Sequence, residues 1–288
     1  FFWGASFPKR GNTWMRAILS SLFFTEDGNF NLSLFNYIIN FDIPDNYKFV
    51  YSLNVDDFNN LHKLPVISKY WLEAQKRVKV SGDFAFFKTH SGNVTLNNFK
   101  YTNTDNVLGF IYIVRDPRDV VVSYSKHFSS SIDESIQSIA NKNLITWTGH
   151  PKDKFYPVLM GSWDIHYKSW KILDVPKLII KYETLLNNTR KTLNQIIEFF
   201  SQNYDINFKN IEMKIDNILE TTSFKQLHAI EKKQGFTEAP YFHSEKKIAE
   251  YFFRKGTNDQ WKEKLSSAQV KKIETSFGPT MKELGYIK

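Results

Sequence analysis

Hydrophobic positions occur in blocks along the chain, and these blocks predict strands separated by helices. Residues 1–7 form a continuous apolar run of strand length, and from Asn12 the apolar side chains recur every three or four positions, as on one helix face. Further apolar runs of strand length cover residues 83–88, 108–114 and 177–182. Such strands, alternating with helices, are typical of a parallel sheet buried on both faces. The pattern predicts an α/β fold with a parallel central sheet flanked by helices.

The remaining segments complete this prediction. Helical spacing is found at residues 117–128, 132–141, 161–173, 190–200, 267–277 and 279–284, whereas residues 26–80 and most of 129–159 are polar and predict loops with short helices. No repeat and no shift in composition marks a boundary along the 288 residues. We therefore expect one domain over residues 1–288.

Composition and charge narrow the functional classes. The net charge of +8 favours anionic partners, and the complete absence of cysteine excludes disulfides, thiolate metal sites and a cysteine nucleophile. A chain without cysteine fits a reducing compartment, and no apolar run approaches the ~20 residues of a membrane-spanning helix. We expect a cytoplasmic protein with no membrane partner.

The first chemical signal is the turn after the first strand, Pro8-Lys9-Arg10-Gly11, which leads into the helix that begins near Asn12. Backbone N–H groups and the helix dipole at such a turn attract anions, and Lys9 adds a mobile charge. The turn is not a Walker A motif, and no G-x-G-x-x-G, G-x-S-x-G or H-E-x-x-H occurs in the chain. An ordinary strand-to-helix turn is the alternative interpretation.

Two further signals follow predicted strands. Lys88-Thr89-His90 ends the second strand, and alternation along an extended chain directs Lys88 and His90 to the same side, where His90 can act as a general base. Arg115 ends the third strand, and Ser123 lies two helical turns beyond it, which suits a phosphate site. A structural histidine and a salt-bridged helix start are the corresponding alternatives.

Together these motifs resemble those of the cytosolic sulfotransferases, which use 3′-phosphoadenosine 5′-phosphosulfate (PAPS). Residues 7–14 are similar to the family's 5′-phosphosulfate loop, Y-P-K-S-G-T-T-W, and residues 115–123 are similar to its 3′-phosphate motif. The other matching segments are Lys88-Thr89-His90, Gly161-Ser162-Trp163 with His166, Thr222-Ser223-Phe224-Lys225, and Arg254-Lys255-Gly256 with Trp261. They occur in the family's order over nearly the whole chain. The resemblance implies a P-loop-NTPase-like sulfotransferase fold.

The resemblance also implies the reaction and its residues. A sulfuryl group would pass from PAPS to a hydroxyl or amine of a small, apolar or ring-bearing acceptor, leaving the product PAP. His90 would be the base, with Lys9 and Lys88 as the other catalytic groups and no metal. The implied nucleotide-binding residues are Lys9, Arg10, Gly11, Asn12, Thr13, Trp14, Arg115, Ser123, Tyr182, Thr222, Phe224, Arg254, Lys255 and Gly256. Trp14 and Phe224 would enclose the adenine.

The chain also departs from the family pattern. Arg10 and Asn12 replace Ser and Thr of the first loop, and position 259 is Asp where the C-terminal motif has a second Gly. The family's dimerisation pattern is degraded near residues 262–271, which leaves the oligomeric state open. Other possible functions are a carbohydrate or glycolipid sulfotransferase, a P-loop nucleotide kinase, and a non-catalytic nucleotide-binding module. We expect no nucleic-acid partner.

Overall fold

The computed structural model describes residues 1–78, 82, 85–148, 155–236, 251–253 and 256–288. The chain divides into two compact units. The first unit comprises residues 1–12, 38–181 and 261–288, and the second comprises residues 13–37 and 182–260. The expectation of one domain over the whole chain stays a prediction.

A five-stranded sheet in the order β2–β3–β1–β6–β9 forms the centre of the first unit. Its strands are β1 (Phe2–Ser6), β2 (Ile38–Asn40), β3 (Phe86–Thr89), β6 (Gly109–Val114) and β9 (Lys177–Lys181). All four pairings are parallel. The predicted parallel α/β sheet is therefore confirmed. Because parallel strands end at the same edge, the segments that follow β1, β3 and β6 leave the sheet side by side.

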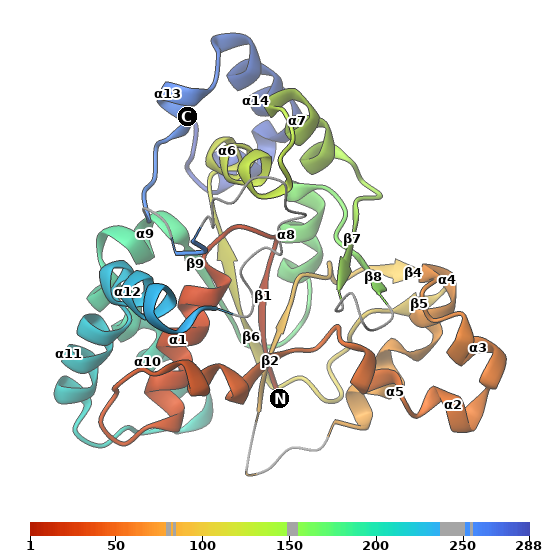
Figure 1. Ribbon diagram of the computed structural model, residues 1–288, viewed down its shortest axis with the longest axis horizontal. Helices are drawn as coiled ribbons and strands as arrows, with labels where there is room; N and C mark the ends of the chain where they lie inside the picture. Colours follow the sequence, from red (N-terminus) through yellow and green to blue (C-terminus); the bar gives the residue numbers. More distant parts are fainter. Residues whose placement is uncertain (79–81, 83–84, 149–154, 237–250, 254–255) are drawn as a thin grey trace. The chain divides into compact units, whose positions relative to one another are not determined.

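Helices and two small hairpins complete the first unit. Its α-helices are α2 (Val50–Leu53), α3 (Val55–Asn59), α4 (Leu64–Ile67), α5 (Trp71–Lys76), α6 (Pro117–Phe128), α7 (Ile132–Ala140), α8 (Trp163–Lys171), α13 (Trp261–Lys264) and α14 (Ser267–Glu283). The hairpins pair β4 (Thr95–Leu96) with β5 (Phe99–Lys100), and β7 (Ile145–Thr148) with β8 (Tyr156–Leu159). Figure 1 shows α6, α7 and α14 grouped together at the top, where they pack against one another. The 3₁₀ turns η2 (Pro44–Tyr47) and η3 (Ser68–Tyr70) lie beside the short helices in the sequence.

Three tryptophans mark the centre of the first unit's core. Trp3, Trp163 and Trp170 are fully buried, and their ring N–H groups all donate hydrogen bonds, to Thr102 Oγ1, the Arg115 carbonyl and the Ser91 carbonyl. A buried indole without a partner for its N–H destabilises a fold, so these contacts let large aromatic surfaces enter the core.

The second unit consists of helices in its described part. They are α1 (Asn12–Phe24), whose first residue is assigned to the first unit, α9 (Tyr182–Asn187), α10 (Thr189–Tyr204), α11 (Ile211–Thr221) and α12 (Phe224–Gln234), with the 3₁₀ turn η1 (Leu32–Tyr37). The Phe23 ring lies 4.7 Å from the Phe200 ring and 5.1 Å from the Phe208 ring. These contacts join the end of α1 to the end of α10.

Three elements differ from the sequence-based prediction. Strand β2 and the β7–β8 hairpin lie where loops were expected, because β2 has only three residues and two alternate residues of β7, Ile145 and Trp147, are exposed. The two expected C-terminal helices are one helix, α14, which continues through Pro279. Proline removes one helical hydrogen bond, but Phe277, Thr280 and Met281 are buried on either side of it and keep the helix packed.

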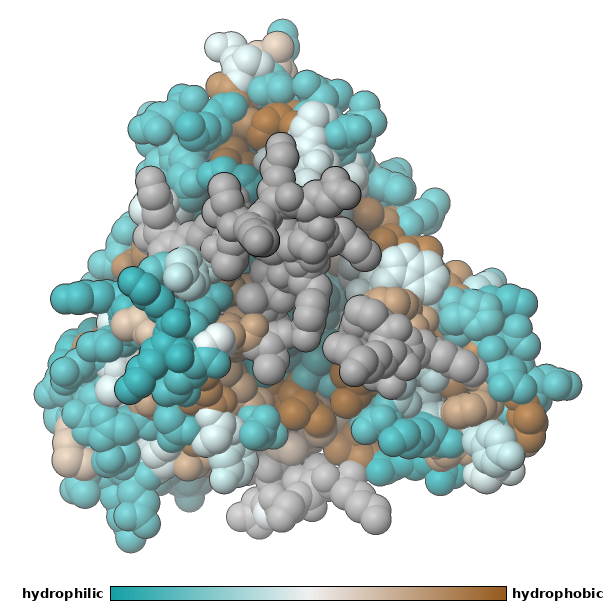
Figure 2. Space-filling model, viewed as in Figure 1, coloured by the Kyte–Doolittle hydropathy of each residue, from teal (hydrophilic) through white to brown (hydrophobic). Residues whose placement is uncertain are grey.

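Of the short helices that follow β2, α2, α4 and α5 each supply buried residues to the core, whereas α3 contributes little. Helix α3 has no buried residue, and Leu53 and Val55 are 58% and 49% exposed. The surface over α2 and α3, at the lower right of Figure 2, accordingly mixes hydrophilic and hydrophobic residues. Isolated exposed apolar residues of this kind are ordinary for a folded chain.

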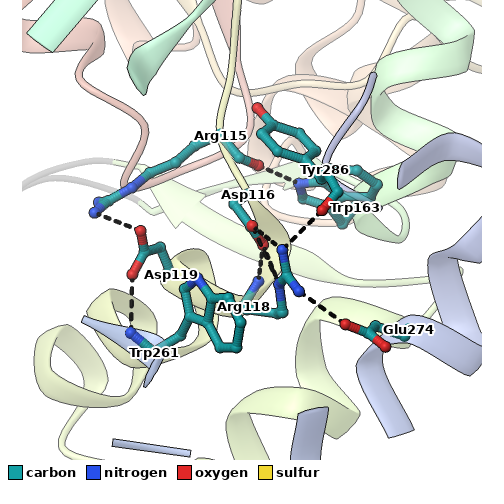
Figure 3. A network of polar contacts seen from close by, with 8 residues as sticks. All are labelled: Arg115, Asp116, Arg118, Asp119, Trp163, Trp261, Glu274 and Tyr286. Atoms are coloured by element: carbon teal, nitrogen blue, oxygen red, sulfur yellow. Dashed lines mark hydrogen bonds and ion pairs between the residues drawn. The ribbon is translucent and has the colours of Figure 1, made fainter. Parts of the chain in front are cut away.

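The start of α6 is fixed by a buried arginine (Figure 3). The Arg118 guanidinium contacts the Asp116 carboxylate at 2.6 Å and Glu274 at 2.8 Å, donates to the Tyr286 carbonyl at 3.1 Å, and lies 3.9 Å over the centre of the Trp261 ring. The Asp116 side chain also caps α6 by accepting from the Arg118 backbone N–H. Arg118 thus ties α13, α14 and the C-terminal segment to α6.

We expect Arg118→Ala to lower the free energy of unfolding by about 3–5 kcal/mol, because it removes the guanidinium that contacts the buried Asp116 carboxylate at 2.6 Å. Arg190→Ala provides the control, since Arg190 is 44% exposed and its partners Glu212 and Asp216 are on the surface. Arg190→Ala should lower the free energy of unfolding by less than about 1 kcal/mol. Urea unfolding measures both values, and equal losses would contradict the role given to Arg118.

Candidate active site

The loop between β1 and α1 contains two residues in the left-handed backbone conformation. Lys9 and Gly11 both have left-handed backbone angles, with φ of 67° and 85°. A positive φ is strained for lysine, and strain of this kind is concentrated at functional sites. Left-handed residues next to right-handed ones direct successive N–H groups toward one point, which is the geometry of a backbone nest. The loop therefore supports the anion cradle expected from the sequence.

The Lys9 side chain contacts a histidine that the sequence analysis did not select. Its Nζ lies 3.3 Å from Nδ1 of His127 on α6. An ammonium group has no acceptor, so His127 receives the hydrogen bond on an unprotonated Nδ1. Ser123 lies one helical turn before His127 and is half-buried. This contact brings the Lys9 side chain to the helix that carries the predicted phosphate-binding serine.

Arg10 has a completely buried side chain. Its guanidinium carbon lies 4.7 Å from the centre of the Phe7 ring and 5.4 Å from that of Trp163, and Nη1 donates to the Tyr112 hydroxyl at 3.3 Å. The side chain is therefore directed into the core of the first unit. The group that Arg10 can offer to an anion in the loop is its backbone N–H.

Asn12 ties the first residue of α1 to β1. Its Nδ2 donates to the Gly4 carbonyl at 3.2 Å and to Ser6 Oγ at 3.0 Å. Both contacts lie within the first unit, so the amide holds the two ends of the loop against each other. Thr13, the next residue, is also buried.

The orientation of His90, which follows β3, is set by the strand beside it. Its Nδ1 lies 2.7 Å from the carbonyl oxygen of Ser6, the last residue of β1. A carbonyl oxygen can only accept, so Nδ1 carries the proton and the lone pair of the neutral ring is on Nε2. Lys88 and His90 are half-buried whereas Thr89 between them is fully buried, as the alternation along the strand predicts.

A buried carboxylate supports the same strand end. Asp42 accepts hydrogen bonds from the Thr89 hydroxyl at 2.7 Å and the Tyr101 hydroxyl at 3.0 Å, and from the backbone of His90. Burial raises the pKa of Asp42 to about 6, against the lowering effect of those hydrogen bonds. Asp42 was not expected from the sequence, because its partners are distant along the chain.

One face of α8 contacts the ends of two strands. Its rings at positions 163, 166 and 170 donate to backbone carbonyls: Trp163 to Arg115 at 3.2 Å, His166 to His90 at 3.1 Å and Trp170 to Ser91 at 2.9 Å. Spacings of three and four residues place these rings on the same helix face. We call this contact set the α8 clamp. It holds the segments that follow β3 and β6.

Arg115 directly follows β6 and lies within the network of Figure 3. Its side chain is buried, and Nη2 lies 3.5 Å from a carboxylate oxygen of Asp119. Asp119 also accepts from the backbone N–H of Trp261 at 3.2 Å. A buried guanidinium positioned in this way at a strand end is suited to an anionic ligand.

The residues expected at the adenine gather in the second unit. Trp14 Nε1 donates to the Thr222 carbonyl at 2.9 Å, and its ring centre lies 4.7 Å from that of Phe224 and 6.3 Å from that of Tyr182. A base enclosed between two rings needs about 7 Å between them. The rings of Trp14 and Phe224 therefore have to separate to enclose an adenine.

Gly256 packs against this aromatic group. Its φ is 50°, and a Cβ atom there would lie 2.5 Å from the Phe224 ring. Glycine is thus required at position 256 by both the backbone and its neighbour. Arg254 and Lys255, which precede it in the predicted 3′-phosphate motif, lie outside the described residues.

In the described parts of the chain, no three His, Asp or Glu side chains come close enough to hold a metal ion. No helix in those parts is both long enough and apolar enough to cross a bilayer.

Comparison with solved structures identifies the class of fold. Mouse sulfotransferase SULT7A1 complexed with PAP superposes with a TM-score of 0.57 at 20% identity, over 97% of this chain and 84% of that one. Retinol dehydratase in complex with androsterone and inactive cofactor PAP gives a TM-score of 0.60 at 18% identity, over 98% of this chain and 80% of that one. The predicted P-loop-NTPase-like sulfotransferase fold is confirmed.

Sequence comparison gives the family. Residues 2–285 match the model of the sulfotransferase domain, and the chain belongs to the sulfotransferase family. Sulfotransferase 1A1 of Rattus norvegicus is 27% identical over 207 residues, which cover 69% of this chain and 63% of that protein. Sulfotransferase 1B1 of Mus musculus is 26% identical over 282 residues, or 96% of this chain and 81% of that protein. The match to the rat protein thus spans less than two thirds of its length.

We expect Asp42→Asn to change how stability depends on pH. Because the pKa of Asp42 is raised from 3.8 to about 6 in the fold, the folded chain binds more protons than the unfolded chain between these values. Wild-type stability therefore falls as the pH rises from below 4 to above 6, by about 3 kcal/mol in total from this group. Asparagine removes that fall.

The measurement is urea unfolding of wild type and Asp42→Asn at several pH values. The stability of the variant relative to wild type should increase between pH 4 and pH 7. A difference that is the same at every pH would show that Asp42 does not titrate in this range.

Proposed function

We propose that this chain transfers the sulfuryl group of PAPS to a hydroxyl or amine of a small molecule, with PAP as the second product. The observation that supports this most directly is the orientation of His90. Because Nδ1 is bonded to the Ser6 carbonyl at 2.7 Å, the lone pair of the neutral ring lies on Nε2, as a general base requires. Ser6 is two residues before the anion-binding loop, so one hydrogen bond links the base to that loop.

The proposed transfer is an in-line displacement at sulfur. The acceptor oxygen bonds to sulfur while the bond from sulfur to the 5′-phosphate oxygen breaks, and the acceptor proton passes to His90 Nε2. Lys9 neutralises the departing 5′-phosphate, and Lys88 neutralises the transferring group. The N–H groups of Arg10 and Gly11, with Asn12 and Thr13 at the helix start, complete the phosphosulfate cradle. Because lysines supply the positive charge, this mechanism requires no metal.

We propose that the remaining nucleotide contacts follow the resemblance. Arg115 and Ser123 of the first unit would hold the 3′-phosphate, together with Arg254, Lys255 and Gly256. Trp14 and Phe224 would stack on the adenine, and Thr222 and Tyr182 would supply polar contacts. The direction of the Arg115 side chain toward Asp119, in a buried site at a strand end, supports the phosphate role.

The acceptor side of the proposal rests on exposed aromatic residues. Three aromatic-rich segments, residues 30–51, 128–156 and 234–242, are predicted from the sequence to line the acceptor pocket. Trp147 and Phe128 are 56% and 44% exposed in the segment 128–156, and Tyr37 is 55% exposed in the segment 30–51. The third predicted segment, residues 234–242, lies mostly outside the described residues. We propose an apolar or ring-bearing acceptor and a cytoplasmic location, with no nucleic acid among the partners.

The test is transfer of radiolabelled sulfate from PAPS, in wild type and His90→Ala. We expect wild type to label an aliphatic alcohol and a phenol, and His90→Ala to lower kcat with the alcohol by roughly 10²–10⁴. A nitrophenolate acceptor is already ionised and needs no base, so its rate should fall much less. PAP should still stabilise the variant against heat as it does wild type.

Two results would contradict this proposal in different ways. Absence of transfer by wild type, together with no thermal stabilisation by PAP, would remove the sulfotransferase assignment. Equal losses for the alcohol and the phenolate in His90→Ala would leave the assignment and remove the base role.

We also expect Gly256→Ala to weaken PAP binding, because the added Cβ displaces the Phe224 ring on which the adenine would stack. Loss of stacking on one ring should raise the dissociation constant roughly tenfold. Gly235→Ala is the matched control, since Gly235 has a φ of 75° but no atom within 4 Å of an added Cβ.

Both glycine variants place a side chain at a positive φ, and only one touches the aromatic group. Titration calorimetry with PAP compares them with wild type. Equal weakening by the two variants would mean that strain, and not the Phe224 ring, changes the affinity.

A further inference from the structure

A chain of buried hydrogen bonds leads from the anion-binding loop to the backbone of His90. Arg10 Nη1 lies 3.3 Å from the Tyr112 hydroxyl, and that hydroxyl lies 2.8 Å from Nδ1 of His166. Nε2 of His166 then lies 3.1 Å from the carbonyl oxygen of His90. Arg10, Tyr112 and His166 are all at most 1% exposed. The three side chains come from the loop, β6 and α8.

The chemistry of the two end groups fixes which atoms donate and which accept along this series of hydrogen bonds. A guanidinium can only donate, so the Tyr112 oxygen accepts from Arg10 and its own hydrogen is directed at His166 Nδ1. The carbonyl of His90 can only accept, so His166 Nε2 carries the ring proton. The opposite tautomer would place an imidazole lone pair against the carbonyl lone pairs at 3.1 Å. One tautomer of His166 therefore satisfies both contacts.

The charge of Arg10 supports this neutral tautomer. Burial and, to a lesser extent, the nearby Arg10 guanidinium lower the pKa of His166 well below its usual value. The ring stays neutral at physiological pH and keeps Nδ1 as an acceptor. A serine at position 10, as in the family's usual loop, would bring no charge to this site.

The contact at the His90 carbonyl complements two others on the same residue. The His90 backbone is also bonded to Asp42, and its ring is bonded to the Ser6 carbonyl. Contacts on the N–H and on the carbonyl hold the backbone on both sides of the His90 Cα, and so fix the direction of the Cα–Cβ bond from which the ring extends toward Ser6. The donor on His166 therefore restrains the direction in which the imidazole points.

We propose that Arg10, Tyr112 and His166 form a positioning relay, which orients the His90 imidazole for proton transfer by holding its backbone carbonyl. The proposal rests on the proposed function, since it gives the relay a purpose only if His90 is the base. The relay gives the Arg10 guanidinium a role inside the core, in addition to the role proposed for the Arg10 backbone N–H in the loop. None of the three side chains touches a substrate in this role.

The test compares the aliphatic alcohol with nitrophenolate in variants of the relay. Tyr112→Phe keeps the ring and removes the hydroxyl, and we expect it to lower kcat with the alcohol by roughly 3–10-fold, as loss of one hydrogen bond implies. The rate with nitrophenolate, the KM for PAPS and the affinity for PAP should stay at wild-type values. Arg10→Met should act in the same direction as Tyr112→Phe.

Two substitutions of His166 separate its donor from its bulk. The amide nitrogen of His166→Gln can occupy the position of Nε2 and donate to the His90 carbonyl, whereas His166→Leu cannot donate. We expect glutamine to retain most of the alcohol activity and leucine to lose it. Tyr167→Phe is the control, because Tyr167 is the next residue of α8 and donates to Glu283 at 2.7 Å, outside the relay.

The tautomer of His166 gives a readout that does not depend on activity. In ¹⁵N-histidine-labelled wild type, we expect the histidine signal that is missing in His166→Gln to come from a neutral ring with its proton on Nε2 across the physiological pH range. A proton on Nδ1 would overturn the direction of the relay.

Kinetic outcomes distinguish failure of the relay from failure of the base. Equal losses for both acceptors in Tyr112→Phe, or a loss as large in Tyr167→Phe, would overturn the relay. If His90→Ala still lowers the rate with the alcohol selectively, His90 remains the proposed base even though the relay is overturned. If His90→Ala affects both acceptors equally, the base role itself fails, and the relay fails with it.

Discussion

Where the strands of a parallel sheet end, the last backbone carbonyl groups have no partner in the neighbouring strand. Each of them needs a hydrogen-bond donor from elsewhere. In the first unit these donors are ring N–H groups. The His90 ring bonds to the carbonyl of Ser6, and the α8 clamp bonds to those of His90, Ser91 and Arg115. A ring N–H sits at the end of a stiff side chain. Satisfying the carbonyls therefore also fixes where the chain leaves each strand.

The buried cation at position 10 is compatible with this arrangement because its surroundings are aromatic. Removing a guanidinium from water costs several kcal/mol, and the faces of Phe7 and Trp163 and the Tyr112 hydroxyl offset part of that cost. Trp163 thus contacts Arg10 with its ring face while its edge holds the Arg115 carbonyl. The same indole contacts the loop between β1 and α1 and the segment that follows β6.

The fold was predictable where hydrophobic spacing is regular, as in β6, whose six residues are all buried, and in α6, whose bounds agree with the predicted ones. Strand β2 was not predictable, because three residues are too few to show the alternation of apolar and polar positions that marks a strand. In the candidate site, local motifs predicted roles for Lys9, His90 and Arg115. Asp42 and Tyr112 carry no local signal, since they act through partners 47 and 54 positions away. The roles of Asp42 and Tyr112 become visible only when the fold brings these distant partners into contact.

The α8 clamp has a consequence for the motions of the molecule. Trp163 and Trp170 are seven residues apart on one helix, and they hold segments that leave two different strands. A fluctuation that lifts α8 therefore releases both strand ends at once, and neither segment can open while α8 stays in place. In terms of hydrogen exchange, the amides after β3 and after β6 belong to a single cooperative unit that opens and closes with the helix.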